Sequence, residues 1–106
     1  MKKIITVKLW NRPPYLKKLV DSLEKLSGIE EYKVIFSVDK SGDKETKIIK
    51  HILENSTLNK DVYYHDTNLG CAGNTRFCLD KGFETNSDYV IHLEDDTIPA
   101  KDYLKF

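Results

Sequence analysis

Three features are missing from this chain of 106 residues: an excess of one charge, a long hydrophobic run and a recognisable cysteine motif. Lysine plus arginine and aspartate plus glutamate number 17 each, so no overall positive field attracts nucleic acid and any anion site has to be local. Near the N-terminus, charged Lys8 follows only a few apolar residues, too few for a signal-peptide core or a membrane span.

The two cysteines, Cys71 and Cys78, are seven positions apart. This spacing matches neither a CxxC redox pair nor a zinc-binding pattern, and we expect two reduced cysteines in a cytoplasmic protein. No repeat, linker or low-complexity segment is present, and the length allows one domain, residues 1–106, with one modest core.

Apolar segments typical of strands alternate with segments typical of helices. The predicted strands are residues 4–9, 34–38, 62–65 and 89–93. Helices are predicted from Pro13 to before Gly28, on the apolar stripe of residues 48–53, and from Thr75 to Lys81 with Gly82 as the stop. Residues 68–73 are predicted as a glycine-rich loop, and a short turn or helix is predicted from Pro99 to the end.

This alternation predicts an α/β fold: a Rossmann-like, doubly wound, mostly parallel sheet of about four strands with helices on both faces. If the first three strands wind outward and the fourth lies on the other side of the first, the strand order is 3-2-1-4. Ligands of such folds bind at the carboxyl ends of the strands, where the winding direction reverses. That edge would bring together Trp10, Asn11, Arg12, Asp39 and the acidic residues 94–96.

The acidic triplet Glu94-Asp95-Asp96 directly follows the last predicted strand. Carboxylates at the end of a buried strand suit a hard divalent cation, and Mg²⁺ or Mn²⁺ is commonly held by one or two carboxylates plus phosphate oxygens. Successive strand side chains point to opposite faces, so we expect Asp96 to bind the metal and Asp95 to accept a hydrogen bond from a sugar hydroxyl. A solvated acidic turn is the alternative.

Other residues at this edge have both a binding and a structural interpretation. Asp39 would accept a hydrogen bond from a base or a ribose hydroxyl, or cap the following turn. Trp10 would stack on a base or pack at the rim of the sheet, and Arg12 would bind a phosphate or cover a helix start. His92 shares a strand face with Glu94 and Asp96, but a histidine within a parallel strand is more typically a core residue.

A glycine-rich segment, residues 68–76, leads into the third predicted helix. Glycines allow close approach of a ligand, and a helix N-terminus favours negative charge. The segment is neither a Walker A loop nor a GxGxxG motif. Arg76 would reach a diphosphate from here, or it is a surface arginine of a well-capped helix.

Taken in order, these motifs resemble the N-terminal, nucleotide-sugar-binding half of a GT-A fold glycosyltransferase. Asn11-Arg12-Pro13-Pro14 is similar to the Asn-Arg-Pro of the N-acetylglucosaminyltransferase I group, and Ser37-Val38-Asp39 to the strand that carries the base-binding aspartate. Residues 68–76 resemble the asparagine-glycine and Ala-Arg-Asn region of family 2 transferases. Glu94-Asp95-Asp96, followed by Pro99 and Tyr103, is similar to the Glu-Asp-Asp form of the DXD motif.

The resemblance implies nucleotide-sugar-dependent glycosyl transfer with a UDP- or GDP-sugar as donor. It implies that Asp39 holds the base and Asp95 the ribose or sugar, and that Asp96, with Glu94 beside it, binds Mn²⁺ or Mg²⁺ bridging the diphosphate. The remaining donor-pocket residues implied by the resemblance are Trp10, Asn11, Arg12 and Arg76.

The resemblance assigns no catalytic base, because family members continue well past the DXD region and the later part supplies that base and the acceptor site. A shortened chain, a chain completed by a partner or a second copy, and a non-catalytic nucleotide-binding or assembly module all stay open. A receiver domain and a haloacid-dehalogenase-like phosphatase are disfavoured, because both place their acids after the first strand. Residues 8–12 contain no acid.

Overall fold

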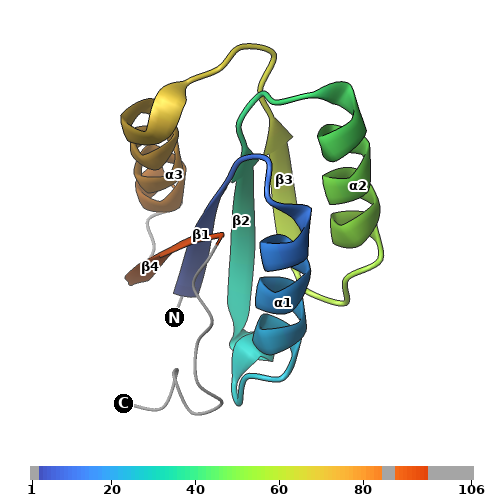
Figure 1. Ribbon diagram of the computed structural model, residues 1–106. Helices are drawn as coiled ribbons and strands as arrows, with labels where there is room; N and C mark the ends of the chain where they lie inside the picture. The colour runs from blue at the N-terminus through green and yellow to red at the C-terminus, as the bar shows by residue number, and fades with distance from the viewer. Residues whose placement is uncertain (1–2, 85–87, 96–106) are drawn as a thin grey trace.

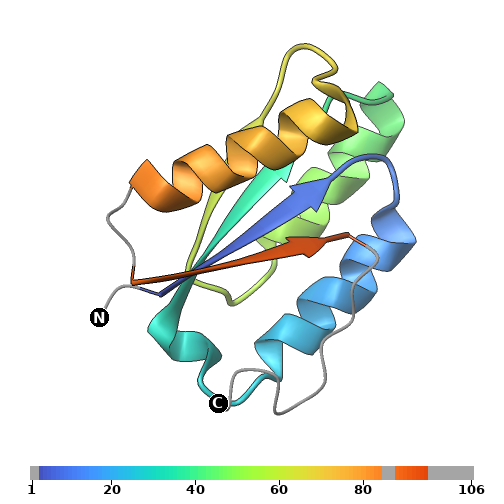
Figure 2. The ribbon, with the colours of Figure 1, turned by 90° about the vertical axis from the view of Figure 1, so that its left-hand side faces the viewer.

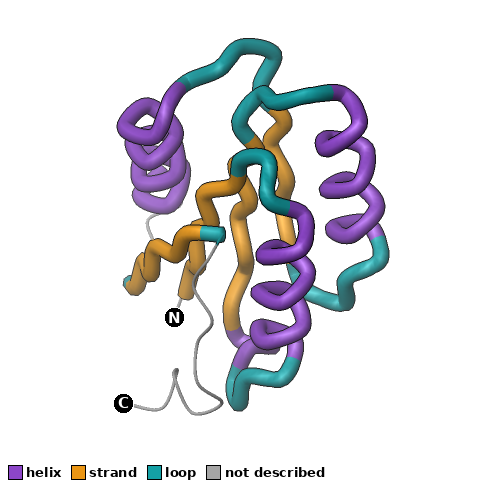
Figure 3. The backbone as a smooth tube through the Cα atoms, viewed as in Figure 1, coloured by secondary structure: helices purple, strands orange, loops and turns teal. Residues whose placement is uncertain are grey.

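A computed structural model describes residues 3–84 and 88–95, and its centre is a four-stranded parallel sheet (Figure 1). The strands are β1 (Lys3–Leu9), β2 (Tyr32–Val38), β3 (Lys60–Tyr64) and β4 (Tyr89–Glu94). The helices are α1 (Pro13–Glu24), α2 (Asp43–Glu54) and α3 (Gly70–Glu84), with a short 3-10 helix at Ile29–Glu31 (Figure 3). The residues from Pro99 onward, where a last turn or helix is predicted, lie outside the described part.

The strand order is β3-β2-β1-β4, which confirms the predicted winding and the position of β3 at an edge. Helices α1 and α2 cover one face of the sheet and α3 covers the other, so the helices lie on both faces as predicted (Figures 1 and 2). In the parallel register Leu9 pairs with Val38 and Lys8 with Glu94. The carboxyl ends of β1, β2 and β4 therefore meet at one edge.

Helix α1 follows the sequence pattern closely. It begins at Pro13, where a missing backbone N–H costs nothing because the first helical donors have no partner within the helix. Its buried residues, Leu16, Leu19, Val20 and Leu23, recur at the spacing of one helix face, and the helix ends at Glu24, before Gly28. The chain then turns at Gly28 with a φ of 87°, a left-handed conformation that favours glycine.

Helix α3 departs from the prediction at both ends. It begins at Gly70 rather than Thr75, so the predicted glycine-rich loop is wrong from Gly70 onward. It also continues to Glu84, so Gly82 lies inside the helix and does not end it. The early start of α3 is stabilised by a side chain that follows β2: the Asp39 carboxylate accepts hydrogen bonds from the backbone N–H groups of Leu69 and Gly70.

Gly82 allows α3 to lie close to the sheet. A Cβ at this position would be 2.8 Å from a methyl carbon of Val90 in β4 and 3.2 Å from that of Thr6 in β1. We expect Gly82→Ala to lower the free energy of unfolding by about 1–3 kcal/mol through overpacking, although alanine is the better helix former. Chemical denaturation measures the change.

The matched control is Asp80→Ala, at an exposed position of the same helix, with an expected change within about 0.5 kcal/mol. A Gly82→Ala variant as stable as the wild type would contradict the close packing of α3 on β1 and β4.

Candidate functional site

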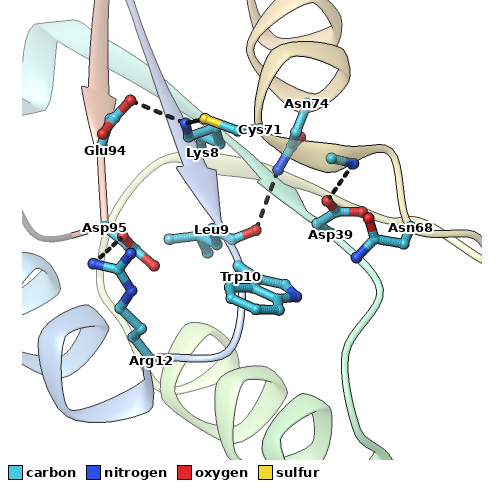
Figure 4. Close-up of a pocket in the computed structure, with 11 residues that line it drawn as sticks. Lys8, Leu9, Trp10, Arg12, Asp39, Asn68, Cys71, Asn74, Glu94 and Asp95 are labelled. Atoms are coloured by element: carbon cyan, nitrogen blue, oxygen red, sulfur yellow. Dashed lines mark hydrogen bonds and ion pairs between the residues drawn. The ribbon is translucent and has the colours of Figure 1, made fainter.

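A cavity of about 360 Å³ opens at the carboxyl edge of the sheet, between the ends of β1, β2 and β4 and the start of α3 (Figure 4). Its size falls within the range of small-molecule sites. Its lining residues are Lys8, Leu9, Trp10, Arg12, Asp39, Asn68, Gly70, Cys71, Asn74, Glu94 and Asp95. The predicted edge is therefore hollow, and charged and amide side chains are among the residues that line it.

Asp39 joins the end of β2 to the start of α3. The side chain is buried, with a residue exposure of 4%. One carboxylate oxygen accepts hydrogen bonds from the backbone N–H groups of Lys40 (2.9 Å) and Leu69 (2.7 Å), and the other accepts one from Gly70 (3.1 Å). The carboxylate caps its own turn, as the structural interpretation expects, and also accepts hydrogen bonds at the start of a distant helix. Its binding to a base or ribose stays a prediction.

Asn74 forms a buried polar contact between α3 and two strands. Its amide nitrogen donates to the carbonyl oxygens of Leu9 (3.2 Å) and Ser37 (3.3 Å), and its amide oxygen accepts from the Ser37 hydroxyl. The Ser37 hydroxyl in turn lies 2.7 Å from Nε2 of His65. Because that hydroxyl donates to Asn74, this network assigns the proton to Nε2 of His65.

Lys8 lies between two partners on the α3 side of the pocket. Its Nζ is 2.9 Å from Oε1 of Glu94 and 2.8 Å from Sγ of Cys71 (Figure 4). The contact with Cys71, together with the Glu94 carboxylate, raises the pKa of Lys8 against the opposing effect of burial. The hydrogen bond from Lys8 likewise lowers the pKa of Glu94. Both groups are charged at neutral pH.

Arg12 and Trp10 line the opposite side of the pocket. Arg12 Nη1 is 3.9 Å from Oδ1 of Asp95, whose side chain is only 10% exposed (Figure 4). Trp10 donates from Nε1 to the carbonyl oxygen of Lys40 at 3.3 Å and leaves 46% of its surface exposed. Glu94 thus pairs with Lys8, and Asp95 lies beside Arg12.

The structure brings five of the sequence-predicted site residues to one cavity: Trp10, Arg12, Asp39, Glu94 and Asp95. Two others do not line it. Asn11 is exposed in the loop after β1, and the side chain of Arg76 is 85% exposed and lies 3.9 Å from Asp80. Asp96, the predicted metal ligand, lies outside the described residues.

Six lining residues are not among the predicted site residues: Lys8 and Leu9 of β1, and Asn68, Gly70, Cys71 and Asn74 of the glycine-rich segment 68–76. A signal existed for Lys8, since a lysine within an otherwise apolar parallel strand needs a charged or polar partner. The role of Asn74 had no local signal, because its partners lie 37 and 65 positions earlier in the chain.

His92 is not among the lining residues. Its Nδ1 lies 3.0 Å from the hydroxyl of fully buried Thr6, and burial lowers its pKa. The structure thus places it partly buried beside the core, in contact with a core hydroxyl. Its buried Nε2 has no hydrogen-bond partner within residues 3–84 and 88–95.

The two cysteines are free and differ in environment. Cys71 is exposed on the first turn of α3, whereas Cys78, on the same helix, is buried. Burial raises the pKa of Cys78 to about 11. The pocket thiol is therefore the accessible one of the pair.

Among the described residues, no group of three or more histidine, cysteine, aspartate or glutamate side chains is arranged to hold a metal ion. Nor does that part of the chain contain a helix long and apolar enough to cross a membrane.

Comparisons with known proteins give a consistent result. The family model for glycosyl transferase family 2 matches residues 4–105. The crystal structure of S. aureus TarS 1–349 in complex with UDP superposes with a TM-score of 0.78 at 26% identity, over 99% of this chain and 30% of that chain. The structure of the same protein in complex with UDP-GlcNAc superposes with a TM-score of 0.79 at 26% identity, over 99% of this chain and 29% of that chain.

Two further matches are more limited. The mannosyltransferase PcManGT from Pyrobaculum calidifontis, in complex with GDP-Man and Mn²⁺, has a TM-score of 0.72 at 17% identity over 98% of this chain and 31% of that chain, a likeness of fold. A mouse alpha-1,6-mannosyl-glycoprotein 2-beta-N-acetylglucosaminyltransferase is 53% identical over 36 residues, which are 34% of this chain and 8% of that protein. The chain thus spans less than a third of each relative named.

Proposed function

This chain belongs to glycosyl transferase family 2, and from that premise we propose that residues 1–106 form a nucleotide-diphospho-sugar-binding domain serving glycosyl transfer. The observation that carries the proposal is the pocket at the carboxyl edge of the sheet, where Trp10, Arg12, Asp39 and Asp95 converge. TarS and PcManGT, which share the fold, are in complex with UDP, UDP-GlcNAc or GDP-Man. A UDP- or GDP-sugar is the donor class proposed here.

The proposed donor contacts follow from the chemistry of the lining side chains. The half-exposed ring of Trp10 offers a surface on which a base stacks. Arg12 provides a fork of N–H donors suited to a phosphate, and Asp95 accepts a hydrogen bond from a ribose or sugar hydroxyl. A carboxylate has about four acceptor positions, and Asp39 uses three of them on backbone N–H groups. Within residues 3–84 and 88–95, this leaves one acceptor position of Asp39 for a base or ribose donor.

We propose Mn²⁺ or Mg²⁺ as the cofactor. The donor set fits a cation that takes one or two protein carboxylates and completes its shell with phosphate oxygens, since the Asp95 carboxylate lines the pocket. Asp96, the second aspartate of the DXD motif, is proposed as a ligand from its sequence position. When bound, the cation supplies positive charge to the leaving nucleoside diphosphate.

Calorimetric titration with UDP, GDP and their sugars, with and without Mn²⁺, tests this function. We expect one base to bind in a metal-dependent manner. Asp95→Asn should weaken that binding by about tenfold or more, because a neutral amide loses the attraction of a carboxylate for the metal and the sugar hydroxyls.

Asp61→Asn is the matched control, because Asp61 pairs with Lys33 at the opposite edge of the sheet, and its binding should equal that of the wild type. If Asp95→Asn and Asp96→Asn both bind as the wild type does, the assignment of the acidic triplet to the donor site is wrong.

A further inference from the structure

Lys8 is a mostly buried cation of the pocket, and neither the family match nor the proposed donor contacts give it a role. Its side chain is only 13% exposed, yet it lines the cavity. Burying an ammonium group is costly unless ionic and hydrogen-bonding partners compensate. Two partners are present: the Glu94 carboxylate at 2.9 Å and the Cys71 sulfur at 2.8 Å.

These two partners differ greatly as acceptors. Glu94 provides a full negative charge, whereas a cysteine sulfur is a weak acceptor. An ammonium group has three N–H donors, and the two contacts use two of them. A phosphate oxygen in the pocket therefore gains a strong, charge-assisted hydrogen bond from Lys8, at the expense of at most the weak contact with Cys71. The ion pair with Glu94 is kept.

The acidic side chains of the pocket already have partners, which limits their repulsion of an anion. Asp39 accepts three backbone hydrogen bonds, Asp95 lies 3.9 Å from Arg12, and Glu94 pairs with Lys8. Gly70 and Cys71, which also line the pocket, belong to the first turn of the 15-residue helix α3, whose N-terminus favours negative charge.

We propose that Lys8 is a diphosphate-binding residue of this pocket and that Glu94 is its positioning residue rather than a metal ligand. The inference rests on the proposed function, because it assigns both residues to the donor site. It implies that the pocket retains part of its affinity for a diphosphate when the divalent metal is removed.

Binding of inorganic pyrophosphate and of UDP or GDP, measured by calorimetry in EDTA, tests the role of Lys8. Lys8→Met, which keeps the length of the chain and removes the charge, should bind about tenfold more weakly. Lys8→Arg should restore most of the affinity. The control is Lys3→Met, at the other end of β1, where Lys3 pairs with Glu31 at 3.2 Å, and its binding should be unchanged.

Glu94→Gln separates the two roles of the carboxylate. If Glu94 positions Lys8, this variant should keep the increase in affinity that Mn²⁺ produces in the wild type. If Glu94 is a metal ligand, that increase disappears and this part of the proposal is overturned.

The pocket thiol provides a second readout that needs no activity. Alkylation of Cys71 should slow by about tenfold when a diphosphate occupies Lys8, and this protection should be absent in Lys8→Met. Buried Cys78, with a pKa of about 11, should stay unmodified in the folded protein and so reports that each variant is folded.

The outcomes distinguish the two proposals. If the wild type binds neither pyrophosphate nor any nucleoside diphosphate, with or without Mn²⁺, the proposed function fails and Lys8 has no diphosphate to bind. If the wild type binds and folded Lys8→Met binds equally well in EDTA, the role of Lys8 is overturned while the proposed function stands.

Discussion

Replacing Asn74 with aspartate is expected to lower the free energy of unfolding by about 3–5 kcal/mol near neutral pH, although the two side chains have nearly the same shape. Asn74 is 1% exposed, and its amide nitrogen donates to the carbonyl oxygens of Leu9 and Ser37. A carboxylate oxygen in that place would face two acceptors in a buried site. The cost is large against a typical stability of about 5–15 kcal/mol.

The destabilisation caused by Asn74→Asp should grow as the pH rises. A buried carboxyl group facing carbonyl oxygens favours its protonated form, so its pKa in the folded variant should lie above that in the unfolded chain. Folding then takes up a proton, and the variant loses stability relative to the wild type as the pH rises. Urea denaturation at about pH 4.5 and about pH 8 measures the difference, which should be larger at the higher pH.

Asn59→Asp is the control for this change, because Asn59 is exposed in the loop between α2 and β3. Its free energy of unfolding should change by less than about 0.5 kcal/mol. An Asn74→Asp variant with wild-type stability at both pH values would contradict the buried contact between α3 and the ends of β1 and β2.

Replacing Asp39 with alanine is expected to lower the free energy of unfolding by about 2–4 kcal/mol, because three backbone N–H groups lose their shared carboxylate acceptor. The same change is expected to abolish nucleotide binding. Two of these groups belong to Leu69 and Gly70, where α3 begins. Without the carboxylate, the first turn of α3 should unwind, and Gly70 and Cys71 would no longer form one wall of the pocket.

Hydrogen exchange of individual amides separates this local effect from general destabilisation. The amides of Leu69 and Gly70 should exchange slowly in the wild type and quickly in Asp39→Ala, while the amides of β1 stay protected. Asp66→Ala is the control, because Asp66 is exposed in the loop before α3. If the two amides stay protected in Asp39→Ala, another group holds the helix start and the carboxylate is not its cap.

Much of the fold could be predicted because its signals are local. The apolar strands are interrupted by helices at regular spacing, and this alternation indicates right-handed crossovers and a parallel sheet. Helix α1 could be placed because Pro13, the stripe from Leu16 to Leu23 and the stop at Gly28 all lie within one continuous segment. The edge that carries the site followed from the winding order.

Helix α3 could not be predicted to the same degree, because its start depends on a side chain from another element. In the sequence, Gly70 and Gly73 favour a loop. In the structure, Asp39 satisfies the N–H groups of Leu69 and Gly70, and the helix begins about five residues earlier than predicted. The sequence likewise predicts a helix end at Gly82, because the side chains that lie close to it, Val90 of β4 and Thr6 of β1, belong to other elements.

The sequence by itself determined the order of the elements, the parallel sheet and the edge where Arg12, Asp39, Glu94 and Asp95 come together, because hydrophobic periodicity and turn residues act over short distances along the chain. Only the tertiary structure decided the partners of the charged groups: Lys8 with Glu94 and Cys71, Arg12 with Asp95, and Asp39 with the start of α3. Those pairings depend on distances between elements and on which buried donors lack an acceptor. No local pattern specifies either one.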